Sequence, residues 1–147
     1  MSDLRTTPVT RGIHHLGFAV SDLPAARDFF VQALGHKLLG ENPDYPAAFV
    51  TDDTTMITLW GLLDPESAPQ FDRRRYPGLH HAAFAVATDD LVALFDRLAA
   101  WPGVSVDVTP RPNLAVEDAS HFIIFIPGGP RVEFYCTPGV AGLGSAT

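Results

Sequence analysis

Residues 12–20 (GIHHLGFAV) and residues 78–86 (GLHHAAFAV) are close copies of each other in a chain of 147 residues. Each copy begins with Gly, an apolar residue and a His pair, and then alternates through a Phe and a Val. The second His of each pair, His15 or His81, keeps the same offset from the Phe and the Val. A repeat of this kind indicates a duplicated structural module.

Each copy reads as a strand with two different faces, because successive side chains of a strand point to opposite sides. His15 and His81 share their faces with Gly and Ala, whereas the Phe and Val side chains lie on the other face. Small residues make a poor core and a good cavity wall, so the alternation predicts that His15 and His81 point into a pocket. A register slip of one residue would put His14 and His80 there instead.

Composition narrows the class of protein. Hydrophobic residues make up 46% of the chain, which is enough to bury a core, and the length suits one domain or two small fused modules. A formal net charge of -7 argues against a nucleic-acid partner. The single cysteine, Cys136, allows no internal disulfide and favours a reducing compartment. With no signal peptide or long apolar run, we expect a cytoplasmic protein with no membrane partner.

The order of expected elements is the same in both halves. A strand, a capped helix and three further strands follow one another, first after Gly12 and again after Gly78. The expected organisation is an N-terminal arm (1–11), a first βαβββ module (12–61), a Pro-rich linker (62–77), a second βαβββ module (78–137) and a C-terminal tail (138–147). A loop over 110–119 is a candidate lid.

The last expected strand carries a carboxylate between apolar residues. Glu133 shares a face with Arg131 and Tyr135, while its direct neighbours in the chain are apolar. A carboxylate in such a strand is costly to bury unless it is paired or binds a metal. Together with His15 and His81 it forms a candidate 2-His-1-carboxylate site. That donor set suits Fe(II) best and also accommodates Mn, Co, Ni or Zn.

The duplicated pattern resembles the vicinal oxygen chelate superfamily, which is also called the glyoxalase, bleomycin-resistance and dioxygenase superfamily. The resemblance covers about residues 12–137 and rests on four segments in order: residues 15–23 (HLGFAVSDL), 29–35 (FFVQALG), 81–86 (HAAFAV) and 127–134 (PGGPRVEF). It implies an α+β fold in which two tandem βαβββ modules form an incomplete mixed β-barrel around a metal-containing cavity.

The resemblance also implies which residues hold the metal. His15 matches the ligand of the first strand, His81 that of the fifth and Glu133 that of the eighth, for one divalent ion. Many members of the superfamily dimerise, some by pairing modules between chains, so a homodimer is expected. Whether modules pair within or between chains is left open by the sequence.

Two departures from the family pattern matter. Glyoxalase I enzymes use a fourth ligand where this chain has Thr58, a poor ligand, so a strict glyoxalase I is disfavoured. A Tyr that is common in the seventh strand of fosfomycin-resistance enzymes is missing, and that strand carries His121. His121 is a candidate acid or base near the metal, as extradiol dioxygenases need.

Other side chains are candidates for the pocket wall. Met56, Trp60 and Phe125 are expected to line it, although core packing explains them nearly as well. Arg131 and Tyr135 either orient a polar substrate, with Tyr135 a further catalytic candidate, or pair with acids at the rim. A run of three Arg residues at 73–75 reads first as solvated linker and second as an attractor of anionic substrates.

The sequence therefore predicts a divalent-metal-dependent enzyme that binds oxygens of a small organic molecule. The reaction would be of the glyoxalase lyase or isomerase type, or an extradiol ring cleavage if the metal is iron. The alternative is a metal-free protein that sequesters a small molecule, as bleomycin-resistance relatives do.

Overall fold

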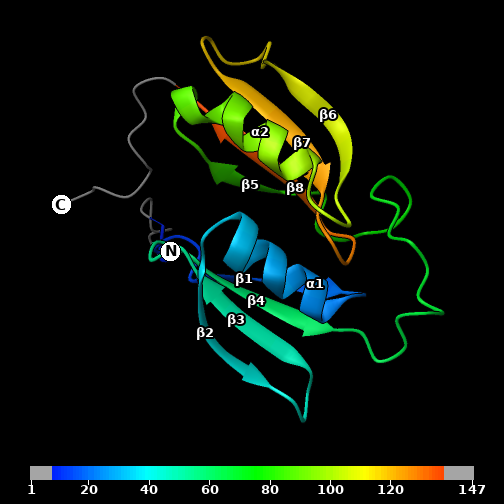
Figure 1. The fold of residues 1–147 in the computed structure, drawn as a ribbon. Helices are drawn as coiled ribbons and strands as arrows, with labels where there is room; N and C mark the ends of the chain where they lie inside the picture. Colours follow the sequence, from blue (N-terminus) through cyan, green and yellow to red (C-terminus); the bar gives the residue numbers. More distant parts are fainter. Residues whose placement is uncertain (1–7, 138–147) are drawn as a thin grey trace, which may run out of the picture.

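The computed structural model describes residues 8–137. Its elements follow the order expected for two βαβββ modules, which Figure 1 shows one above the other, joined by a long linker on one side. The predicted C-terminal tail and most of the predicted N-terminal arm lie outside the described residues. Within residues 8–137, no helix is long and apolar enough to cross a membrane.

The first module is a four-stranded mixed sheet with a helical segment after its first strand. Its strands run in the order β1-β4-β3-β2, and β1 is parallel to β4. The Asp22 carboxylate accepts a hydrogen bond from the Ala25 N–H and so supplies the expected cap of this helix. The elements are β1 (His15–Val20), α1 (Leu23–Asp28), the π-helical turn η1 (Phe29–Ala33), β2 (Lys37–Asn42), β3 (Ala47–Thr51) and β4 (Met56–Gly61).

The second module repeats this topology, with strand order β5-β8-β7-β6 and β5 parallel to β8. Its first strand is shorter than predicted and begins at Ala82, so His80 and His81 precede it. Ala82 pairs with Val132, and β8 begins only one residue earlier, at Arg131. His80 and His81 therefore have almost no part of β8 to pair with. The elements are β5 (Ala82–Ala85), η2 (Thr88–Asp90), α2 (Leu91–Ala99), β6 (Ser105–Pro112), β7 (Ser120–Phe125) and β8 (Arg131–Cys136).

The two modules share one hydrophobic core, which is built from the helix-bearing faces of both sheets. In Figure 1, α1 lies between its own sheet and the second sheet. The ring centroid of Phe30, in the turn that continues α1, lies 6.2 Å from that of Phe84 in β5. Phe84 in turn stacks on Phe134 of β8, with ring centroids 6.0 Å apart. Because side chains alternate along a strand, the faces that carry His15 and Glu133 point away from this core.

A close backbone contact also joins the modules. The Ser21 N–H donates to the Gly128 carbonyl at 3.0 Å, which ties the end of β1 to the β7–β8 turn. Gly128 has φ +87, and a Cβ built on it would lie 2.9 Å from the Val20 Cβ. A side chain at this position would therefore force the two modules apart.

Candidate metal site

The Glu133 carboxylate is the centre of a cluster on the outward face of the second sheet. Glu133 is 8% exposed, and its Oε2 lies 3.1 Å from Nε2 of His81. Its Oε1 contacts Nδ1 of His121, which reaches it diagonally from β7. The two imidazoles satisfy both oxygens of a carboxylate that would otherwise be costly to bury.

The first His of each repeated pair contacts the second. Nδ1 of His14 lies 3.0 Å from Nδ1 of His15, and Nδ1 of His80 lies 2.7 Å from Nδ1 of His81. In each such contact one ring nitrogen donates and the other accepts, so the first His of each pair is a hydrogen-bond partner of the second. The repeated His-His dipeptide was the sequence signal for this pairing. Alternation of faces alone put the two His residues of each pair on opposite sides of the strand and did not predict their contact.

His80 is suited to support a ligand histidine. Desolvation is the largest cause that lowers the pKa of His80, and the nearby positive charge of Arg131 lowers it further. A metal-bound His donates its other ring N–H to a neighbour. A neutral His80 can accept that hydrogen bond from Nδ1 of His81.

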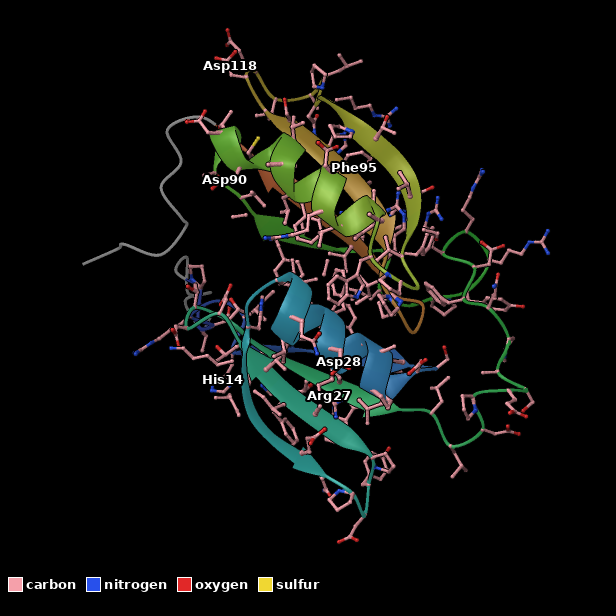
Figure 2. All side chains as sticks on the ribbon, in the orientation of Figure 1. His14, Arg27, Asp28, Asp90, Phe95 and Asp118 are labelled. Atoms are coloured by element: carbon pink, nitrogen blue, oxygen red, sulfur yellow. The ribbon has the colours of Figure 1, made fainter. Side chains whose placement is uncertain are left out.

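His15 lies in the first sheet, and in the described part of the chain no strand of this sheet pairs with a strand of the second. Figure 2 shows its neighbour His14 at the start of β1, beside the first module. Across residues 8–137, no three His, Cys, Asp or Glu side chains are grouped so that they could hold a metal ion. The fold of one chain thus brings His81 and Glu133 together and leaves His15 apart from them.

The residue types still fit a divalent metal. Two imidazole nitrogens and a carboxylate oxygen are donors for borderline metals from Fe(II) to Zn(II). His81 and Glu133 meet at the distance of a hydrogen bond, through the same atoms that would bind a metal. A single chain therefore brings together two of the three predicted donors and lacks only His15 beside them.

The outward face of the first sheet carries Thr58, Met56 and Trp60. Gly17 of β1 lies opposite Thr58, and a Cβ on Gly17 would lie 3.1 Å from the Thr58 hydroxyl. That hydroxyl is buried and accepts a hydrogen bond from the Trp60 indole N–H at 2.9 Å. Aromatic contacts at the same face hold Trp60 against Phe49, with ring centroids 5.8 Å apart. Thr58 is therefore engaged inside its own sheet.

The remaining predicted site residues lie on the outward face of the second sheet. Tyr135 pairs with His121 across the strands, and the two ring centroids are 6.1 Å apart. Phe125 pairs with Arg131 at the end of the sheet near the β7–β8 turn. Nε of Arg131 contacts the Asp107 carboxylate at 2.8 Å. Nothing in the sequence singled out Asp107, because strand pairing alone brings β6 beside this end of β7.

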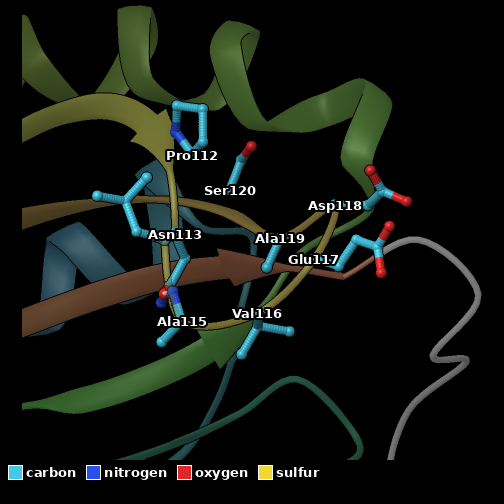
Figure 3. A pocket seen from close by; sticks show the side chains of 9 residues that line it. Pro112, Asn113, Ala115, Val116, Glu117, Asp118, Ala119 and Ser120 are labelled. Atoms are coloured by element: carbon cyan, nitrogen blue, oxygen red, sulfur yellow. Dashed lines mark hydrogen bonds between the residues drawn. The ribbon is translucent and has the colours of Figure 1, made fainter.

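The loop between β6 and β7 forms a hollow of its own. The Asn113 N–H donates to the Ala119 carbonyl at 2.8 Å and closes the loop. Figure 3 shows the acidic side chains Glu117 and Asp118 at one end of this hollow. The residues that line it, 112–120, include none of the predicted site residues. The first residues of the expected loop, 110–112, belong to β6 instead, and the role of the remaining loop as a lid stays a prediction.

Comparison with known proteins places this arrangement in a family. The family model described as Glyoxalase/Bleomycin resistance protein/Dioxygenase superfamily matches residues 12–134. The match spans nearly all of both modules, and the chain belongs to this superfamily. The predicted α+β fold of two tandem βαβββ modules is confirmed, and its two mixed sheets form an open arrangement that does not close.

Solved structures share the fold at low sequence identity. A possible glyoxalase from Bacillus cereus is 26% identical, with a TM-score of 0.62, over 86% of this chain and 100% of that one. A genomically encoded fosfomycin resistance protein from Listeria monocytogenes is 15% identical, with a TM-score of 0.69, over 88% and 95%. A lactoylglutathione lyase from Agrobacterium tumefaciens is 17% identical, with a TM-score of 0.62, over 88% and 96%. These likenesses cover 86–88% of this chain and show that it shares their fold.

Proposed function

We propose that the chain is a divalent-metal-dependent enzyme whose site is completed between two copies of the chain. The observation that carries this proposal is the buried Glu133 carboxylate, held 3.1 Å from Nε2 of His81 on a face that points away from the core. An outward face with a buried carboxylate is half of a cavity, and it needs a second wall.

The second wall is the matching face of the other module, supplied by another copy. The first module carries His15 on a face of small residues, also turned away from the core. In a two-fold symmetric dimer, the first module of one copy faces the second module of its partner, and the same contact occurs twice. His81 and Glu133 of one copy would then hold the metal with His15 of the second copy.

The residues around this centre have distinct tasks. The metal, when bound, supplies Lewis-acid polarisation of substrate oxygens, or oxygen chemistry if it is iron. His121 holds the Glu133 carboxylate and is the candidate acid or base for proton transfer. Tyr135, whose ring contacts that of His121, is the candidate hydrogen-bond donor to a polar substrate. The chemistry that suits this set is a lyase or isomerase reaction of the glyoxalase type, or extradiol ring cleavage.

A second candidate function follows from the position of His15. Because a single chain does not assemble the three donors, the fold is also compatible with a metal-free protein that binds and sequesters a small molecule. Under that proposal the His81–Glu133 contact is a structural pair. Ligand binding would then survive alanine substitution at His15, His81 and Glu133.

Elemental analysis of protein purified without a His tag tests the enzyme proposal. We expect about one metal per chain in the wild type and almost none in a Glu133→Ala variant. The matched control is a Glu117→Ala variant, which removes an exposed carboxylate from the β6–β7 loop instead of from the candidate metal site. The absence of metal from the wild type after reconstitution with Fe, Mn, Co, Ni and Zn would reject the enzyme proposal and favour the binding protein.

A further inference from the structure

A cavity of about 840 Å³ lies at the junction of the two modules. We call it the junction cavity, and it is lined by parts of β1, the linker, the segment just before β5, the start of β6 and the β7–β8 turn. Its volume is in the range of sites for small molecules. Apolar and aromatic side chains from the linker and the second module, Phe71, Leu79 and Phe125, form part of its wall.

The linker is seated against the rest of the protein rather than free of it. A Cβ built on Gly78, at the start of the second repeat, would lie 2.7 Å from the Phe71 ring. Glycine at this position thus lets the Phe71 ring lie directly against the backbone. The linker brings Arg73 to the same cavity.

The charge of the junction cavity is positive, although the chain carries a formal net charge of -7. Two guanidinium groups, Arg73 and Arg131, line it, and among the described residues no acidic side chain does. Both guanidiniums approach the same carboxylate, because Asp107 lies 2.8 Å from Nε of Arg131 and 3.9 Å from Nη2 of Arg73. One carboxylate cannot balance two cations, so one positive charge is left for a ligand.

Arg131 is also held in place before any ligand arrives. Its side chain is 11% exposed, and the contact with Asp107 fixes its guanidinium. A guanidinium that is already oriented loses little side-chain entropy when it binds an anion. The cavity therefore combines a preorganised cation with a flat apolar wall.

The junction cavity adjoins the candidate metal site at two points. His80, which lines the cavity, directly precedes His81, and Arg131 lies two residues before Glu133 on the same face of β8. Two residues along a strand span roughly 7 Å. One small molecule can therefore reach from Arg131 to the side chains around Glu133.

We propose that the junction cavity binds the anionic end of the substrate, which is a small organic acid with a flat apolar body. Only the statement that this ligand is the substrate rests on the proposed enzyme function. The binding itself depends on Arg73, Arg131 and the aromatic wall, and requires no metal. Its failure and the failure of the metal site can therefore be told apart.

Calorimetric titration with 1-naphthoate tests the cavity, with the uncharged 1-naphthamide as a probe of the same shape. Both are titrated into metal-free wild-type protein and into the Glu133→Ala variant. We expect 1-naphthoate to bind the Glu133→Ala variant at least as tightly as the wild type, because a nearby negative charge is removed. We expect 1-naphthamide to bind each protein about ten-fold more weakly than 1-naphthoate does. Equal affinity for the two probes, or loss of 1-naphthoate binding in Glu133→Ala, would overturn the proposal.

Two substitutions of opposite sign locate the binding. Arg73→Gln removes a cation and is expected to weaken 1-naphthoate binding about five-fold. Asp107→Asn removes the competing negative charge but keeps an amide oxygen that can accept the hydrogen bond from Nε of Arg131. It is therefore expected to strengthen binding by a similar factor. Arg75→Gln is the matched control, because Arg75 pairs with Asp72 on the exposed linker and does not line the cavity. If Arg73→Gln and Asp107→Asn change the affinity no more than Arg75→Gln does, the ligand does not bind in this cavity.

Discussion

A metal centre shared between two copies makes a quantitative prediction about mixed dimers. Take one copy with His15→Ala and a second copy with Glu133→Ala, each with a different affinity tag, and isolate the heterodimer. One of its two sites then combines His15 of one copy with His81 and Glu133 of the other, and it is intact. The second site lacks both His15 and Glu133. The heterodimer should hold about half the metal of the wild type, whereas each parent homodimer should hold almost none.

The converse pair makes the test symmetric. A double variant, His15→Ala with Glu133→Ala, paired with the wild-type chain leaves one ligand missing from each shared site. This heterodimer should hold almost no metal if the sites are shared, and about half the wild-type amount if each chain builds its own site. The two pairs therefore give opposite results under the two arrangements.

The assay is elemental analysis after dialysis against metal-free buffer, with the dimer confirmed by light scattering. Activity is not required, so an unidentified substrate does not limit the test. The shared site would be refuted if the heterodimer of the double variant with the wild-type chain held metal while the heterodimer of the two single variants held none. A monomeric wild-type protein that binds metal through His15, His81 and Glu133 would refute it as well.

Three further predictions concern the shared core and the module junction. Phe30→Ala should lower the free energy of unfolding by about 3–5 kcal/mol, measured by urea denaturation, since Phe30 is fully buried at the contact between modules; a loss under 1 kcal/mol would contradict this packing. Gly128→Ala should lower the free energy of unfolding more than Gly129→Ala does. A Cβ at Gly128 meets Val20 at 2.9 Å, whereas Gly129 has open space at a similar positive φ. Equal losses of stability would show that the backbone conformation, and not the contact with Val20, sets the cost. Desolvation lowers the pKa of the buried His36, so the unfolded chain takes up the proton first and stability falls as the pH drops below about 6.5. His36→Leu should reduce that fall between pH 7.5 and pH 5 in denaturant titrations, and an unchanged pH dependence would assign it to other groups.

The repeat determined most of the fold. Two copies of one strand pattern, each followed by a capped helix and three strands, are enough to predict two βαβββ modules because the local signals agree in both halves. Asp22 caps α1 as the sequence predicts, and Gly35 ends the first helical segment with φ +74. Alternation along β1 likewise placed Phe18 in the core and His15 on the outer face.

The contacts between elements were decided by the tertiary structure. The sequence could select His81 and Glu133 as candidate ligands, but it could not show that His121 contacts the same carboxylate. The single core built by the helix-bearing faces turns His15 and Glu133 outward on different sheets, and no local pattern encodes that choice. The reason is physical, because side-chain alternation fixes which face of a strand is apolar. What covers that face depends on packing between segments that are far apart in the chain, or on a second copy of it.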